Sequence, residues 1–525
     1  MLRHWSLLVV TVSLLGSSAQ LRAADIDFAH DIVPLLRQQC GKCHTGEKRE
    51  GAFSMNTREL LIAGGESGKA IVIGSSAKSE LIARITTKDN DLRMPPEGPR
   101  LTEAQVTLLT KWVDSGLSWQ DGFAFQKPAY EPPLKPRRPE LPPVVANRGN
   151  PVDRFVDAYF VTQKLERPAV VADTVFARRV YLDSIGLLPT PAQLARFEAD
   201  QRPDKRALLV RELLADDIAY AEHWLTFWND LLRNDYTGTG FITGGRKQIT
   251  KWLYEALVNN KPYDQFVREL VAPTAASEGF IQGIRWRGDV NSSQTQEVQF
   301  AQNISQAFLG INMKCASCHD SFIDHWKLDQ AYGLAAIYAQ QTLEIHRCDK
   351  PTGRQAQAAW LFPELGQIDP KAPQPVRLQQ LAALMTHPDN GRLTRTVVNR
   401  LWHRLLGRGI VHPTDAMGTE PWNADLLDFL ASDLADHNYN LKQTLELICT
   451  SEAYQAVTPA IEAESNNSGY QFRGPIARRL TAEQFVDAVW QLTGTAPLKS
   501  DAGVLRAKLL AAPTQPAEKL TGHWV

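Results

Sequence analysis

The sequence predicts a mainly α-helical protein with a small helical N-terminal domain, a proline-rich linker and two larger, mostly helical domains. Three observations support this fold class. Apolar residues recur at three- and four-residue spacing over much of the chain, capping boxes precede two of these stretches, and eight prolines fall between residues 127 and 151. Because 43% of the 525 residues are hydrophobic and 22% are charged, the composition is that of a folded protein with several domains.

The numbers of basic and acidic residues are nearly equal, which limits the kinds of partner to expect. The chain has 57 Lys and Arg against 58 Asp and Glu, which gives a net charge of −1. No overall basic field is therefore present to attract a phosphate backbone. Nucleic acid is not an expected partner.

Residues 1–24 have the features of a signal peptide. A short basic start, Met1 to His4, precedes an apolar run from Leu7 to Leu15, and small residues follow at which a signal peptidase can cut. A buried N-terminal helix or an uncleaved membrane anchor is the alternative, but the apolar run is too short to span a bilayer. We therefore expect an exported protein, located in the periplasm, outside the cell or at the cell surface.

The six cysteines include two copies of one pattern. The copies are Cys40-Gly41-Lys42-Cys43-His44 and Cys315-Ala316-Ser317-Cys318-His319. Cys-x-x-Cys-His is the attachment signature of c-type haem, in which two thiols add to the porphyrin and the histidine that follows ligates the iron. We therefore expect haem c at the first motif, with His44 as an iron ligand, and a second haem c at the other motif, with His319 as an iron ligand.

Two other kinds of site could explain the Cys-x-x-Cys pairs in place of haem. A Cys-x-x-Cys pair can be half of a zinc site, and the two motifs could share one ion, but zinc leaves both histidines without a role. A thioredoxin-like redox pair is a further alternative, although neither motif lies in a strand–turn–helix context. The remaining cysteines, Cys348 and Cys449, could form a disulfide in an oxidising compartment or stay as buried thiols.

The first motif lies in residues 25–125, a segment that reads as a small helical domain. An apolar stripe runs into the motif, and a capping box that starts at Thr102 opens a later helix. Residues 45–99, between them, are expected to be rich in loops. Only Met55 and Met94 offer a thioether as sixth iron ligand here, and we favour Met94 because the two prolines after it stiffen its loop. The alternative is that Met94 only fills a gap in the core.

These residues resemble a known family. The sequence from Asp31 to His44, together with Arg93-Met94-Pro95-Pro96 and Leu101-Thr102, is similar to the planctomycete-type cytochrome c domain. In that family the domain stands at the N-terminus of large secreted proteins whose downstream domains have unknown function. The resemblance implies a cytochrome c-like helical fold for residues 25–125, with haem as the cofactor.

Residues 126–150 are expected to form the proline-rich linker. Such a composition favours an extended, semi-rigid spacer, which would tether the haem domain to the rest of the chain.

Residues 151–350 form the expected middle domain, and the second motif lies near its end. A capping box opens at Thr190, and an aromatic and aliphatic stripe around Trp224 is typical of a core. Residues 177–190 and 261–267 resemble the middle domain of the same family. They mark the family but reveal no mechanism.

The sixth ligand of an iron at the second motif is not evident from spacing. His346 is our first choice, because it is well separated from His319 and lies in a stretch that resembles the family. His403, His223 and Met313 follow, and an empty position is the remaining alternative. An empty position would allow ligand binding or peroxide chemistry.

Residues 351–525 are expected to form a C-terminal helical domain. Blocks at 399–411, 426–431 and 478–484 resemble the last domain of the same family. In the family this domain usually continues further, so the resemblance implies that the chain is truncated at Val525 or that the final portion is dispensable.

Three functions stay open on the sequence. The favoured one is a secreted dihaem c-type cytochrome that passes electrons to or from a redox partner protein or a small electron carrier. The second is a haem-dependent oxidoreductase or peroxidase-like enzyme with catalysis at the second haem. The third is a cell-surface scaffold that binds polysaccharide, in which haem is incidental. The sequence names no substrate and no oligomeric state.

Overall fold

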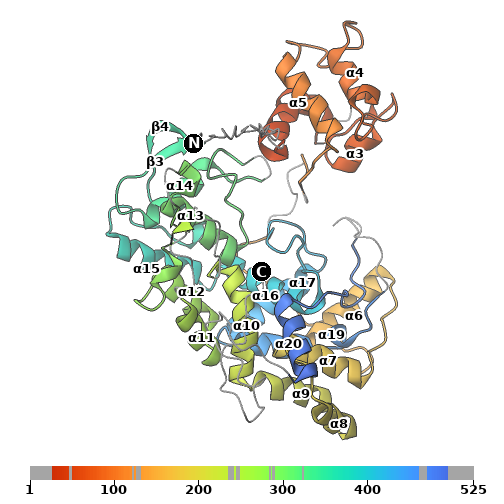
Figure 1. The fold of residues 1–525 in the computed structure, drawn as a ribbon, viewed down its shortest axis with the longest axis vertical. Coiled ribbons are helices and arrows are strands. Elements are labelled where there is room, and N and C mark those ends of the chain that lie inside the picture. Colours follow the sequence, from red (N-terminus) through yellow and green to blue (C-terminus); the bar gives the residue numbers. More distant parts are fainter. Residues whose placement is uncertain are drawn as a thin grey trace, which may run out of the picture. The chain divides into compact units, whose positions relative to one another are not determined.

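The computed structural model divides the chain into two compact units, residues 1–127 and 128–525 (Figure 1). The described residues are 26–46, 50–120, 123–125, 132–234, 242–243, 249–282, 285–286, 290–321, 324–459 and 470–494. The signal peptide predicted for residues 1–24 lies outside them. The structure is 53% helical, and the strands of its described part form two small antiparallel sheets, so the mainly α fold class is confirmed. No helix in the described ranges has the length and apolar character needed to cross a membrane.

The first unit is built from short helices. Its elements are η1 (Phe28–Ile32), α1 (Val33–Gln39), α2 (Gly41–His44), η2 (Glu50–Ala52), α3 (Arg58–Ala63), η3 (Ser76–Lys78), α4 (Glu80–Thr86) and α5 (Glu103–Asp114). The predicted capping box is confirmed at α5, where Thr102 and Gln105 exchange side-chain and backbone hydrogen bonds. Phe28 packs on Trp119 at 4.5 Å and on Phe123 at 5.2 Å between ring centroids. Since η1 continues into α1 and α2, this aromatic cluster positions the first motif.

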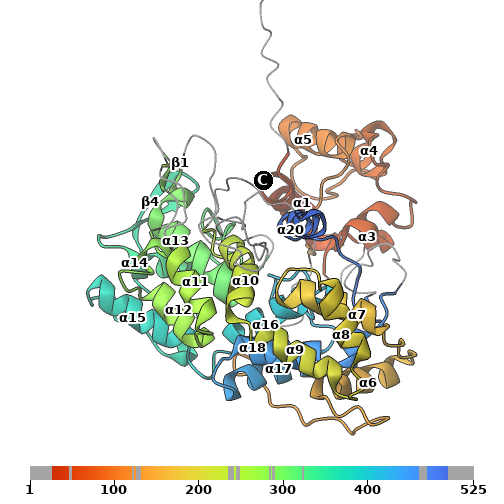
Figure 2. The same cartoon turned by 60° about the horizontal axis from the view of Figure 1, so that its bottom comes forward.

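The second unit is a larger helical body centred on α16 (Figure 2). Its helices are α6 (Pro151–Gln163), α7 (Asp173–Ser184), α8 (Pro191–Ala199), α9 (Lys205–Leu214), α10 (Asp217–Leu231), α11 (Thr250–Val258), α12 (Tyr263–Val271), η4 (Glu278–Phe280), η5 (Ser292–Gln294), α13 (Gln296–Ile304), η6 (Ser305–Leu309), α14 (Leu328–Tyr338), η7 (Pro363–Leu365), α15 (Gln374–Met385), α16 (Gly391–Leu406), α17 (Ala424–Asp436), α18 (Leu441–Cys449), α19 (Glu452–Gln455) and α20 (Ala482–Thr493). Its strands are β1 (Ile242–Thr243), β2 (Arg285–Trp286), β3 (Glu344–Arg347) and β4 (Lys350–Gln355). Fourteen of the sixteen residues of α16 are buried, which makes it the central helix.

The segments expected as separate domains, 151–350 and 351–525, share one hydrophobic core. A single cluster of buried side chains extends from Val152 in α6 to Phe472 after α19. In the aromatic stripe predicted on α10, Trp224 and Trp228 are buried within this cluster and Phe227 packs against it. A boundary at residue 350 falls inside the β3–β4 hairpin, where His346 pairs with Pro351. The two segments therefore fold against each other as one body.

The described part of the proline-rich segment, residues 132–150, packs on the second unit. The carbonyl oxygen of Leu134 accepts a hydrogen bond from the N–H of Gly391 at 2.8 Å, and Arg137 pairs with Asp428 at 2.5 Å. The prolines keep the segment extended, and these contacts hold it along α16 and α17. The described part of the predicted extended spacer is therefore docked on this unit.

Candidate functional site

The first Cys-x-x-Cys-His motif folds as one helical turn. Cys40 is the N-cap of α2, and its carbonyl oxygen accepts hydrogen bonds from the N–H groups of Cys43 at 3.3 Å and His44 at 3.1 Å. Residues three and four positions apart on such a turn lie on the same face. Local backbone structure alone therefore presents the two thiols and the imidazole together.

These three side chains line a cavity of about 710 Å³ in the first unit. Its wall also includes Met94, fifty residues after His44 in the sequence. Ligand cavities in proteins typically have volumes of about 300 to 1,000 Å³. The four residues assigned to the first haem from the sequence, Cys40, Cys43, His44 and Met94, thus meet at one cavity of suitable size.

The surroundings of His44 fit a bound cofactor. The Nδ1 atom of His44 is buried and has no hydrogen-bond partner within the described residues. The ring packs against Phe53 at 5.0 Å between ring centroids, and the His44 carbonyl oxygen accepts a hydrogen bond from the Met55 N–H at 2.8 Å. A buried polar atom without a partner costs free energy, so the ring suits a site that another group completes. Cys40, Cys43 and His44 therefore fit a covalently attached haem.

Two thioethers reach this cavity. Met94 is half-buried, its N–H donates a hydrogen bond to the Arg84 carbonyl oxygen at 2.9 Å, and Pro95 and Pro96 after it also line the cavity. Met55 is fully buried in the same wall. The predicted ligand Met94 is therefore at the cavity, and Met55 is a second thioether that the wall offers.

The Cys40 thiol is held in its protonated form. Burial, and after it the neighbouring Cys43, raises the pKa of Cys40 to about 12. At neutral pH the group is therefore a thiol and not the nucleophilic thiolate.

Arg84 is a residue of the cavity wall that sequence reasoning missed. It pairs with Glu80 at 2.7 Å along α4, and its guanidinium also donates to the Ser67 hydroxyl at 3.1 Å. A guanidinium is a suitable partner for the propionate carboxylates of haem. The seven residues of α4 lie in the stretch expected to be rich in loops. So short a helix was not predicted, because it gives little periodic signal.

The second motif has the same backbone turn as the first. The Cys315 carbonyl oxygen accepts hydrogen bonds from the N–H groups of Cys318 at 3.0 Å and His319 at 3.2 Å. This motif is embedded more deeply, since Ser317 is fully buried and the exposed fraction of His319 is 5%. The Nδ1 atom of His319 lies 2.8 Å from the Asp320 carbonyl oxygen. Donation from Nδ1 makes Nε2 the nitrogen with the lone pair that can coordinate.

Cys348 lies beside the second motif. Its N–H donates a hydrogen bond to the Cys318 carbonyl oxygen at 2.7 Å. Burial raises the pKa of the Cys318 thiol; a hydrogen bond with the Ser293 side chain opposes this rise, and Cys348 adds to it. Cys449, by contrast, is buried in α18 near Tyr454. Cys348 is exposed at the tip of the β3–β4 hairpin and Cys449 is buried in α18, so the disulfide between them considered from the sequence is not favoured by their places in the fold.

His346, the predicted sixth ligand at the second motif, lies on β3. It lines a separate cavity of about 440 Å³ with Tyr332 and Asp349. Its Nδ1 atom lies 3.1 Å from the Glu344 carbonyl oxygen. Neither thiol of the second motif nor His319 belongs to the lining of this cavity. This cavity therefore does not bring His346 and His319 together, and His346 as the sixth ligand stays a prediction.

The lower-ranked ligands lie in other surroundings. His403 on α16 is hydrogen-bonded to the Thr414 hydroxyl at 2.8 Å, His223 is buried in α10, and Met313 is 1% exposed just before the second motif. Among the residues that the structure describes, no three His, Cys, Asp or Glu side chains are arranged to hold a metal ion.

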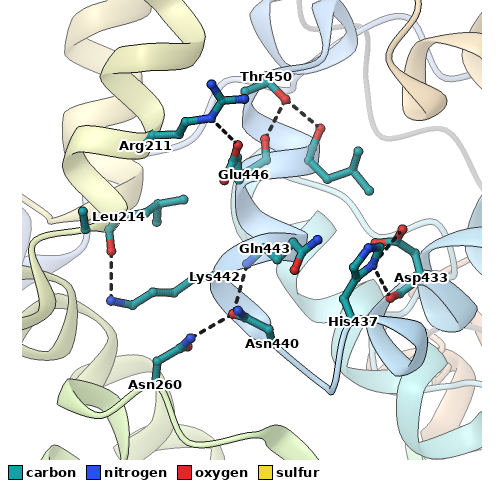
Figure 3. A pocket seen from close by; sticks show the side chains of 12 residues that line it. Arg211, Leu214, Asn260, Asp433, His437, Asn440, Lys442, Gln443, Glu446 and Thr450 are labelled. Atoms are coloured by element: carbon teal, nitrogen blue, oxygen red, sulfur yellow. Dashed lines mark hydrogen bonds and ion pairs between the residues drawn. The ribbon is translucent and has the colours of Figure 1, made fainter.

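A further cavity of about 560 Å³ lies between α9 and α18 (Figure 3). Its charged side chains are compensated within the fold. Arg211 pairs with Glu446, His437 with Asp433, and the Lys442 ammonium donates to a backbone carbonyl. This cavity therefore offers little unmatched charge to a ligand.

Three family models match the chain. The Planctomycete cytochrome C model matches residues 40–98, which contain the first motif and Met94. Two models, each described as a protein of unknown function, match residues 151–342 (DUF1549) and 377–512 (DUF1553). Searches of curated proteins and of solved structures found no match. The first match indicates a cytochrome c-like haem protein. With these three domains in this order, the chain belongs to the planctomycete-type cytochrome c domain proteins.

Proposed function

We propose that the protein is an exported c-type cytochrome that transfers electrons through a haem held by Cys40, Cys43, His44 and Met94. Haem iron with one histidine and one thioether ligand exchanges single electrons, and the thioether raises its potential. In this proposal the two thiols would anchor the cofactor and His44 and Met94 would be its iron ligands. The electrons would pass to or from a redox partner protein or a small electron carrier.

One observation carries the proposal. A turn of residues 40–44 and a loop at Met94, far apart in the sequence, line the same cavity of about 710 Å³. Exposed side chains, among them Lys42 and Glu97, also line it, so the cavity reaches the surface of the unit. An electron-transfer site needs such an opening, because its partner must approach the cofactor. Export is supported by the signal-peptide features of residues 1–24.

A second haem at Cys315 and Cys318, ligated by His319, is a separate part of the proposal. The turn that it shares with the first motif supports it. His319 is 5% exposed, so haem attachment there requires the surrounding segments to open. The function assigned above depends on the first motif alone.

Haem stoichiometry tests both parts. The full chain is exported in a host with a c-type maturation system, and covalent haem is counted by the pyridine haemochrome spectrum and intact mass. We expect Cys40→Ser to remove the haem of the first motif and Cys315→Ser to leave it. Two haems per chain would support the dihaem form. If no variant and no wild-type chain carries covalent haem, the electron-transfer function is wrong.

A further inference from the structure

The tip of the β3–β4 hairpin lies against the second Cys-x-x-Cys-His motif. Cys348 stands in the two-residue loop of this hairpin, and its N–H donates to the Cys318 carbonyl oxygen at 2.7 Å. Bond lengths along this N–H···O=C link keep the two Cα atoms within about 7 Å of each other. Disulfides join Cα atoms about 4.4 to 6.8 Å apart, so the two cysteines are within reach of a disulfide.

The hairpin tip is fixed in this place by its own contacts. The Ser292 hydroxyl donates to the Cys348 carbonyl oxygen at 2.5 Å, and the Ser292 N–H donates to an Asp349 carboxylate oxygen at 2.9 Å. These bonds tie both loop residues to η5 and limit the entropy lost when the thiols join. Cys348 also has a φ of +52°, a backbone region that side chains other than Asn, Asp and Gly rarely adopt. A cysteine is therefore a locally disfavoured choice for this exposed loop, which suggests a role for its thiol.

We propose that Cys318 and Cys348 form a disulfide in the exported chain that carries no haem at the second motif. The bond forms by exchange with a disulfide-bearing oxidant of the extracytoplasmic compartment. The two thiols lose two protons and two electrons as their S–S bond forms, and the oxidant's disulfide is reduced to two thiols. The inference rests on the proposed export, and it does not depend on haem at the first motif.

The disulfide has a consequence for the second motif. A cysteine sulfur that is bonded to Cys348 cannot also form the thioether that attaches haem, so the two states of Cys318 exclude each other. Haem can therefore be attached at the second motif only after the Cys318–Cys348 bond has been reduced. Cys348 thus competes for one of the two attachment thiols, while Cys315 remains outside the bond.

Non-reducing peptide mapping of the exported full chain tests the proposal. Free thiols are alkylated in denaturant, the chain is digested, and the peptide with Cys318 is assigned as linked to Cys348, linked to Cys315, alkylated or haem-bearing. We expect a peptide that links Cys318 to Cys348 and disappears on reduction. In Cys348→Ser, alkylation of Cys318 should rise from near zero to near complete in chains without the second haem. In the control Cys449→Ser, which removes a buried thiol, the link should persist.

Two results would overturn the proposal: an alkylated Cys318 in wild-type chains without the second haem, or a Cys315–Cys318 bond in its place. A titration with a dithiol–disulfide buffer provides a second measurement on the wild-type chain, in which Cys318 and Cys348 should become alkylatable together. The peptide with Cys40 and Cys43 reports the first haem in the same digest, so failure of the proposed function is seen separately.

Discussion

The backbone N–H of Met94 donates a hydrogen bond to the carbonyl oxygen of Arg84 at 2.9 Å. This bond ties the loop after residue 92 to α4, whose Arg84 side chain is itself held by Glu80 and Ser67. The Met94 thioether is thereby held at the cavity wall by backbone structure. A weak iron ligand gains from such positioning, because less conformational entropy is lost on binding.

Replacement of Met94 should lower the reduction potential of the first haem. In Met94→Leu the thioether is absent while the side-chain volume is nearly kept, so the ferrous state loses its favoured ligand. The matched control is Met55→Leu, which changes a fully buried methionine of the same wall. Potentiometric titration of both variants checks the assignment. A lower potential in Met55→Leu alone would make Met55 the ligand.

Addition of one methyl group at Gly391 should loosen the docked proline-rich segment. A Cβ at Gly391 would lie 2.7 Å from the Leu134 carbonyl oxygen and from a Pro136 side-chain atom, too close for either to stay. We expect Gly391→Ala to cost about 1–3 kcal/mol of unfolding free energy and to speed tryptic cleavage after Arg137. Gly418→Ala is the control, because no atom lies within 4 Å of its added Cβ. Equal cleavage rates in the two variants would contradict the docking.

Removal of the Asp153 carboxylate should destabilise the second unit. This side chain is 2% exposed; it pairs with Arg167 and accepts hydrogen bonds at 2.8 and 2.9 Å from the first two N–H groups of α19. Asp153→Ala leaves the two N–H groups of α19 without their acceptor and removes one of the carboxylates that pair with Arg167, which keeps Asp157. We expect a loss of about 2 kcal/mol in urea unfolding. Asp329→Ala, which breaks only an exposed pair with Arg354, should cause no measurable change. Similar stability of both variants would refute the assigned role of Asp153.

The ion pairs of Asp173 should make stability depend on pH in the acid range. A hydrogen bond from Lys205, and further contacts with Arg206, lower the pKa of the Asp173 carboxyl in the folded chain. A lowered folded-state pKa stabilises the fold fully above the unfolded value of about 3.9, and this stabilisation is lost as the pH falls through the folded-state value. Asp173→Asn should therefore cost about 1 kcal/mol at neutral pH and progressively less below about pH 4. Urea unfolding at neutral pH and below about pH 4 measures this cost. Glu198→Gln, on the exposed face of α8, is the control. A cost that is independent of pH would contradict the charge effect.

Local features of the fold could be predicted from the sequence. Capping boxes predicted that two helices begin after Thr102 and Thr190, and both N-termini are confirmed. The turn of each Cys-x-x-Cys-His motif follows from hydrogen bonds between residues three and four positions apart. The residues that make up each of these signals lie within a few positions of each other, so they can be recognised in the sequence. Helices α3 and α4 are too short for this kind of signal, and they lie in the stretch that was expected to be rich in loops.

The helical class, the family and the two Cys-x-x-Cys-His motifs could be recognised from the sequence alone. The fold, by contrast, was needed to see that Met94 and His44 line one cavity, that the proline-rich segment is docked, and that Cys348 lies beside Cys318. The difference comes from separation along the sequence. These contacts join residues tens to hundreds of positions apart, and they form because side chains bury apolar surface and pair buried polar groups across the whole unit. A local pattern of residues does not indicate which distant segment a side chain will contact.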